Sequence, residues 1–230
     1  MRAFIVLGSS RSEPRKQGDR SAPAARRRDW AGIGLLGRGN NLWRGPGQRG
    51  HVGLMSVTNW ETEFRGVWDR GVAAWKAGRR QPQTMFNAAA VAFLASVGCS
   101  AQELFDFVDD AQLYGDFDFS TVLPVTALRR DYFLNVLGGK PTGQRAEMHE
   151  LPAKSEAVDG ISWLPRLIAK ARLKLRGEMP PELMYGCAGD RPFLRRMKMD
   201  LAGFLTLVRD CGADDRKIVE EVKRSAGIKS

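Results

Sequence analysis

The chain has few of the residues that build metal centres and disulfide frameworks. Its 230 residues include two histidines, His51 and His149, and three cysteines, Cys99, Cys187 and Cys211. No two cysteines form a Cys-x-x-Cys pair, whereas a zinc site normally takes several Cys or His ligands at close spacing. We therefore expect no disulfide framework, no metal and no other cofactor.

Long apolar runs are missing as well. A membrane-spanning helix needs roughly 20 predominantly apolar residues, and no run in this sequence approaches that length. The apolar patch in the opening MRAFIVLGSS is too short, and is followed too soon by polar residues, to make a good signal peptide. We expect no membrane contact and a reducing, cytoplasmic compartment.

Acidic residues are scarce at the start of the chain. Residues 1–54 hold 11 Lys and Arg against 3 Asp and Glu, whereas the whole chain has a formal net charge of +10. The same segment holds 10 of the 25 glycines and shows no apolar periodicity. Such a segment buries too little apolar surface to fold. We expect residues 1–54 to be disordered, or to lie upstream of a working protein that starts at Met55.

Apolar residues at helical spacing predict a mainly α-helical protein. Capping boxes at Thr58–Glu61 and at Ser100–Glu103 mark two helix starts. The predicted helices cover residues 58–78, 86–97, 100–114, 120–137, 161–176, 190–197, 200–209 and 214–225. The second of them is nearly all apolar and is therefore expected to be central. Pro124 leaves residues 121–126 open to an extended conformation, and no segment shows the alternation of a β-strand.

The breaks between these helices divide the chain. Residues 55–138 form an N-terminal helical unit, residues 139–160 a polar linker, and residues 161–230 a C-terminal helical unit. The two units either pack as separate small bodies or form one helical bundle.

The segment GISWLPRLIAKARLKLRG, residues 160–177, combines a narrow apolar stripe with five basic residues and no acid. Like charges four residues apart repel each other, so we expect negative charge opposite this helix. The acidic residues of the helix after Ser100 can supply it; a small anion and a nucleic-acid backbone are the alternatives. Those acids are Glu103, Asp106, Asp109 and Asp110. Leu173 faces away from the stripe and predicts a second packing partner.

A lone cysteine between glycines marks MYGCAGDRPFL, residues 184–194. Asp190 is a good N-cap for the helix that follows, and the preferred interpretation is a tight turn that holds a small buried thiol. Free backbone N–H groups in such a turn could instead seat an anion. A third possibility is a nucleophilic Cys187 near Arg191, with His149 as the one histidine outside the first 54 residues.

Several segments together form a pattern. They are a Trp163–Arg166 opening, the basic run Lys170–Leu175, a Tyr-x-Cys-x-x-Asp segment from Tyr185 to Asp190, and Phe193–Leu194. Over about residues 58–225 this pattern resembles the bacterial domain-of-unknown-function family 5069. The resemblance brings no established activity or catalytic residue. It singles out the positions on which the pattern converges, which are Arg166, Lys170, Tyr185, Cys187, Asp190 and Arg191.

These observations lead to one main hypothesis and two alternatives. The main hypothesis is a non-enzymatic, cytoplasmic helical protein that binds a small anionic ligand or a protein partner at a basic pocket formed by the six positions above. The first alternative is an enzyme that uses Cys187 as a nucleophile or redox thiol. The second, nonspecific nucleic-acid binding through the basic segments, is disfavoured because the excess charge lies mainly in residues 1–54.

Overall fold

The structure is a computed structural model that describes residues 59–228. It is mainly α-helical, as the sequence predicts. The predictions that concern residues 1–54 and a start at Met55 lie outside the described residues.

Five helices make up the first half of the described chain. They are α1 (Trp60–Lys76), α2 (Pro82–Met85), α3 (Ala88–Ser96), α4 (Ala101–Tyr114) and α5 (Phe119–Asn135). The second half begins with short elements, η1 (Met148–Glu150), β1 (Ala157–Val158) and β2 (Ile161–Ser162). Four helices follow, α6 (Leu164–Arg176), α7 (Asp190–Arg196), α8 (Leu201–Cys211) and α9 (Asp215–Ala226).

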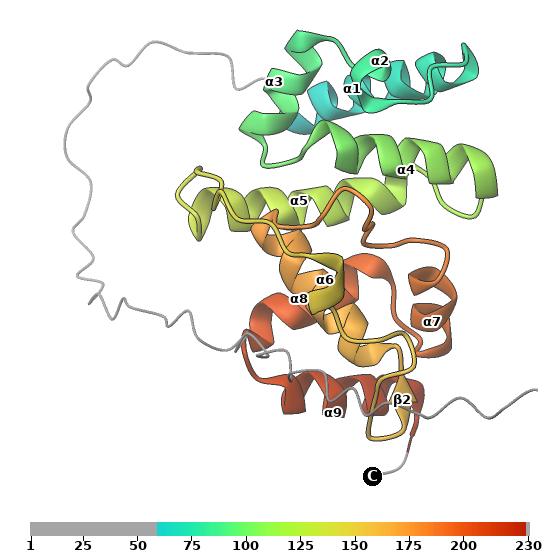
Figure 1. Cartoon of the computed structure of the whole chain (residues 1–230), viewed down its shortest axis with the longest axis vertical. Helices are drawn as coiled ribbons and strands as arrows, with labels where there is room; N and C mark the ends of the chain where they lie inside the picture. Colours follow the sequence, from blue (N-terminus) through green and yellow to red (C-terminus); the bar gives the residue numbers. More distant parts are fainter. Residues whose placement is uncertain (1–58, 229–230) are drawn as a thin grey trace, which may run out of the picture.

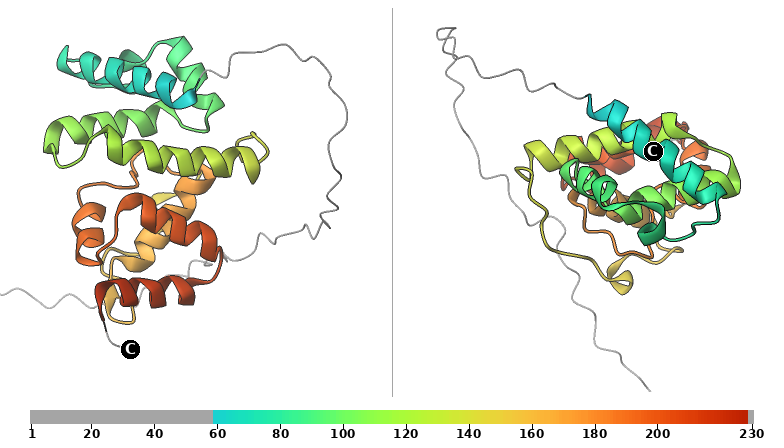
Figure 2. Two further views of the ribbon diagram at one scale, coloured as in Figure 1. Left: turned by 180° about the vertical axis from the view of Figure 1, so that it is seen from behind. Right: turned by 90° about the horizontal axis from the view of Figure 1, so that it is seen from above.

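The helices are stacked along the long axis of the molecule. Figure 1 shows α1 to α3 at one end, α4 and α5 next to them, and α6 to α9 at the other end. The view from behind in Figure 2 shows the same order, and the view from above looks along the stack. Helix α5 is the junction, because it contacts α1 on one side and α6 and α8 on the other.

The buried apolar side chains of residues 59–228 form one main cluster that extends from Phe64 in α1 to Val222 in α9. Its burial removes apolar surface from water, which is the main force that holds such a helical stack together. A second, small cluster joins Leu173 of α6 to Ala146, Leu151 and Leu183. The second packing partner predicted for Leu173 is thus the segment that connects the two halves, together with the loop after α6.

Some local predictions hold and others need correction. The Ser100–Glu103 capping box is present at the start of α4. Helix α1, in contrast, begins at Trp60, and its cap is Asn59. The apolar α3 is not central, because only Ala90 and Leu94 of its residues are buried. Small alanine side chains give a helix an apolar sequence without giving it a face large enough to require burial.

Pro124 lies inside α5, which runs without interruption over residues 119–135. The extended alternative for residues 121–126 is therefore wrong. The expectation of no β-strand is also wrong: β1 and β2 pair antiparallel, with Ala157 opposite Ser162. Asp159 and Gly160 link them, both with positive φ, 50° and 77°. Asp-Gly suits such a two-residue turn, but each strand is too short for alternation to show.

Candidate functional site

The basic side chains of α6 lie inside the protein. Arg166 and Arg172 are 8% exposed and Lys170 and Lys174 are 2% exposed. Buried charges require partners, and most of these cations have one. Arg172 donates to the carbonyl oxygen of Gly212 over 2.7 Å.

The acidic residues of α4 supply part of the compensation, as predicted. The Lys174 ammonium donates to Glu103 Oε1 over 2.9 Å. Burial opposes ionisation of Glu103, but the Lys174 charge and the Ser100 backbone N–H outweigh it, so the pKa of this carboxyl lies below its ordinary value. Glu103 therefore ties α4 to α6 while it caps its own helix.

Arg191 of α7 makes the second link to α4. It pairs with Asp110 at 2.6 Å and with Asp116 at 3.0 Å, and it also donates to the carbonyl oxygen of Gly186 over 2.7 Å. A guanidinium with three acceptors in fixed positions is a rigid clamp. Arg191 thus holds the 184–190 loop against α4, and its charge is fully compensated.

Asp190 is at the centre of the site and does not cap α7. The cap position is Gly189, and the Asp190 side chain is fully buried beside the Lys170 ammonium. Its carboxylate also accepts from Trp163 Nε1 over 3.0 Å and from the Gly186 backbone N–H over 2.8 Å. The prediction that Asp190 caps α7 is therefore wrong. Three donors outside α7 bind its carboxylate in place of the backbone N–H groups of its own helix.

Trp163 is held in a costly conformation at this place. Its φ of 75° lies in the left-handed region, which costs a bulky residue about 1–3 kcal/mol. Its indole ring also packs so closely on Gly189 that a Cβ there would lie 2.7 Å from the ring. Such strain persists only where the surroundings enforce it, and it is typical of functional sites.

Cys187 differs from the other two cysteines. Its sulfur accepts from the Lys170 ammonium over 3.4 Å, and its side chain is partly exposed. Burial raises the pKa of the Cys99 thiol to about 12, and burial together with the Asp214 charge raises that of Cys211. Among the three thiols, all within the described residues, Cys187 alone has an ammonium donor.

A pocket of about 350 Å³ opens between α4, α6 and the loop after α6. Its lining consists of Asp106, Asp109, Asp110, Met148, Lys154, Trp163, Arg166, Lys170, Pro181, Glu182, Leu183, Met184 and Cys187. Of the six predicted site residues, Arg166, Lys170 and Cys187 line it. Asp190 and Arg191 stand behind them as supports. Tyr185 is fully buried and donates to the Leu201 carbonyl oxygen over 2.7 Å.

The pocket carries charge of both signs, so the prediction of a basic pocket needs correction. The charge pattern of one helix does not show which acids of other segments lie opposite it. Two of its acids are engaged: Asp110 with Arg191, and Asp109 as the acceptor of the Trp75 indole N–H over 2.7 Å. Burial raises the pKa of Asp106 to about 7, so this carboxyl is partly neutral at physiological pH.

Arg166 is the exception among the buried cations of α6. Its one hydrogen bond within residues 59–228 goes to the Pro152 carbonyl oxygen over 2.8 Å, and no carboxylate of this part of the chain pairs with it. Arg166 is 8% exposed and lines the pocket. The pocket therefore has a guanidinium that forms no ion pair with the described residues, although acidic side chains line the same pocket.

Sequence reasoning missed the roles of Trp163, Lys154 and Asp106. The left-handed backbone conformation of Trp163 leaves no signal in composition or periodicity. The sequence gives no reason to distinguish Asp106 from the other acids of α4. His149, considered as a base for Cys187, is exposed and is not among the lining residues, although its neighbour Met148 is.

No three His, Cys, Asp or Glu side chains in residues 59–228 are placed to hold a metal ion. No single helix in this range is long and apolar enough to cross a membrane; α3 and α4 reach that length and composition only as a pair bent by 103°.

Most lining residues of this site lie from Met148 onward, and α4 supplies the others. Residues 149–230 match a family described as a domain of unknown function (DUF5069). The resemblance inferred from the sequence is confirmed over these residues, which contain α6, the 184–190 loop and α7. The expected extension back to residue 58 lies outside this match. No curated protein and no solved structure matches the chain.

Proposed function

We propose that the pocket between α4 and α6 binds a small anionic ligand and that Arg166 is its anchor. The observation that carries this proposal is the buried Arg166 guanidinium, which has one backbone acceptor and no carboxylate partner within residues 59–228. A buried charge without a counter-ion is costly. An anion in the pocket removes that cost and gains charge-assisted hydrogen bonds.

Other lining residues support the same ligand class. Lys154 is exposed at the pocket, with its ammonium 6.0 Å from the Trp163 ring. It can approach an anion held by Arg166, while the indole offers a flat apolar wall. A volume of about 350 Å³ is at the lower end of the range of known small-molecule sites. Free cysteines support a cytoplasmic location for this binding protein.

Isothermal titration of the full chain with inorganic phosphate, nucleotides and sugar phosphates tests the proposal. We expect saturable binding of at least one of these classes, and loss of it in Arg166→Gln, which keeps a donor for Pro152. Arg216→Gln is the control, because Arg216 is exposed on α9 and does not line the pocket. Absence of heat with all three classes, or equal affinity in both variants, refutes the proposal.

One observation favours a second candidate, a reaction of the Cys187 thiol. The Lys170 ammonium, fixed by Asp190, lies 3.4 Å from the sulfur, and Asp106 in the same pocket has a pKa raised to about 7 by burial. A nucleophile with a cation beside it and a carboxyl that titrates near neutrality are components of covalent and acid–base catalysis. An Asp106→Asn variant with unchanged Cys187 alkylation across pH 6–8 excludes a role for Asp106 in activating the thiol.

A further inference from the structure

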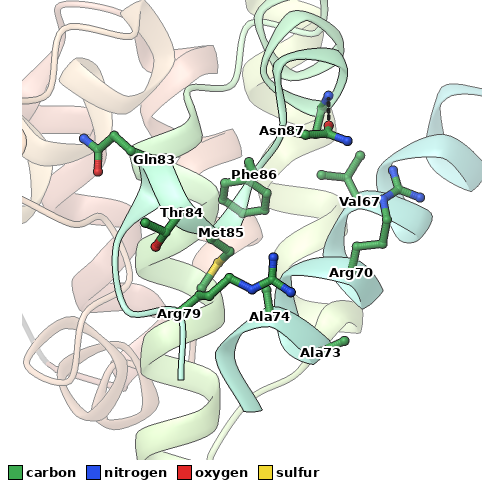
Figure 3. Close-up of a pocket in the computed structure, with 11 residues that line it drawn as sticks. Val67, Arg70, Ala73, Ala74, Arg79, Gln83, Thr84, Met85, Phe86 and Asn87 are labelled. Carbon is green, nitrogen blue, oxygen red and sulfur yellow. Dashed lines mark hydrogen bonds between the residues drawn. The ribbon is translucent and has the colours of Figure 1, made fainter. Parts of the chain in front are cut away.

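A second pocket lies in the N-terminal half and shares no lining residue with the first. It occupies about 480 Å³ between α1, the connection to α2, and the start of α3. Figure 3 shows the side chains around it. Its lining consists of Val67, Arg70, Ala73, Ala74, Arg79, Gln83, Thr84, Met85, Phe86, Asn87 and Ala90.

The charged residues of this second pocket are both positive. Arg70 extends from α1, and Arg79 lies in the connection that follows α1, with its guanidinium directed toward Ala74 (Figure 3). No Asp or Glu is among the lining residues. Neither arginine forms an ion pair within residues 59–228, whereas the neighbouring Arg65 pairs with Asp69 over 3.0 Å. The second pocket thus offers two exposed guanidinium groups that form no ion pair with the described residues.

The floor of the second pocket is apolar and well packed. Met85 and Phe86 are 6% and 7% exposed, and Figure 3 shows their side chains next to each other. Gly71 allows Phe86 to pack closely on α1, since a Cβ at this position would lie 3.1 Å from the ring. Phe86 is thus held directly against α1, and the small exposed area of Met85 and Phe86 faces the pocket.

Neutral hydrogen-bonding groups complete the rim. Asn87 Oδ1 is occupied, because it accepts from the Ala90 backbone N–H over 2.9 Å, as the dashed line in Figure 3 shows. The Thr84 hydroxyl donates to the Gln81 carbonyl oxygen over 3.1 Å. The Asn87 amide N–H₂ group, the Gln83 side chain and the Thr84 lone pairs stay available to orient a polar group.

We infer that the second pocket binds a small amphipathic anion, namely an apolar, ring-sized group that carries a phosphate or carboxylate. The two arginines bind the anionic group, and the Met85–Phe86 floor covers the apolar group. Planar guanidinium groups match phosphate and carboxylate oxygens in geometry as well as charge. An inorganic anion alone would leave the apolar floor uncovered, and a neutral aromatic would leave both guanidinium groups without a counter-ion.

The probes for this inference separate its two parts. The full chain is titrated with phenyl phosphate, inorganic phosphate and benzyl alcohol, and binding is measured by calorimetry and by saturation-transfer NMR. We expect phenyl phosphate to bind more tightly than either of the other two. Arg70→Gln and Arg79→Gln should each weaken phenyl phosphate binding about fivefold, the effect of losing one partly exposed charge contact.

Two further variants make the result specific to this pocket. Ala73→Trp, at an exposed position on the lining, should fill the space and abolish binding while both arginines remain. Arg216→Gln, in neither pocket, should leave the affinity unchanged, and phenyl phosphate binding that persists in Arg166→Gln belongs to the second pocket. Failure of phenyl phosphate to bind overturns the inference, as does binding that survives Ala73→Trp or that Arg166→Gln removes. The last outcome would assign the ligand to the first pocket and leave the proposed function standing.

Discussion

The buried Lys170–Asp190 pair gives the most demanding prediction. Lys170 is 2% exposed and Asp190 is not exposed at all. Asp190→Asn keeps the shape of the side chain but leaves the Lys170 ammonium buried without a counter-charge. Removal of one partner of a buried pair costs about 3–5 kcal/mol. That is a large share of the roughly 5–15 kcal/mol by which a typical protein is stable.

Replacement of Lys170 should lower the free energy of unfolding less than replacement of Asp190. In Lys170→Met the Asp190 carboxylate keeps the donors Trp163 Nε1 at 3.0 Å and Gly186 N–H at 2.8 Å. We expect Lys170→Met to lower the free energy of unfolding by about 2–3 kcal/mol, which is the cost of removing the charge-assisted partner of a buried group. The double variant removes both charges, so its cost should fall short of the sum of the two single costs by about 2–3 kcal/mol, as for coupled residues in contact.

The assay is urea unfolding of the four proteins followed by far-UV circular dichroism and tryptophan fluorescence. Coincident transitions justify the two-state free energies, and an unchanged slope shows that only stability has changed. If each single variant lowers the free energy of unfolding by less than about 1 kcal/mol, the pair contributes no more than an exposed ion pair does. Additive single costs would show that the two side chains do not interact, and either result refutes the reasoning about this site.

Three further predictions concern other positions. Gly98→Ala should destabilise the protein more than Gly78→Ala, by about 1–3 kcal/mol in urea unfolding, because both positions have positive φ but only the Gly98 Cβ would lie 2.6 Å from Phe133 Cβ; equal costs would contradict this. Asp106→Asn should stabilise the protein at pH 8 by roughly 1–2 kcal/mol and little at pH 4. Burial raises the pKa of this carboxyl from 3.8 to about 7, so the native state keeps a proton that the unfolded chain loses, and stability falls as pH rises between these values; a benefit confined to acid pH would reverse the sign. In timed iodoacetamide labelling with peptide mapping, Cys187 should react before the other two cysteines, whose thiol pKa values are raised by burial; equal, slow labelling would end the case for a reactive thiol.

Much of the fold follows from local sequence signals. The caps at Ser100, Asp200 and Asp214 lie next to the helices that the apolar spacing predicts. These signals act over three or four residues, so at these positions they depend little on the rest of the fold. The excess positive charge of α6 likewise predicted that acids would lie opposite it, and Glu103 of α4 does.

The site itself depends on contacts that no local pattern encodes. Asp190 looks like a helix cap in sequence, yet its carboxylate binds Trp163 and Lys170 of the α6 segment and the Gly186 backbone N–H. In the sequence, Arg166 is one of five similar cations of α6. Among the buried cations of this helix, it alone has neither a carboxylate partner nor a second acceptor within residues 59–228.

The sequence by itself determined where helices begin and end and how much charge each one carries, because these depend on neighbours within a turn or two. The tertiary structure decided which charges find partners, which thiol meets an ammonium, and where pockets stay open. Those outcomes depend on the meeting of segments 17 to 81 residues apart, whose relative placement is set by the packing of the whole core.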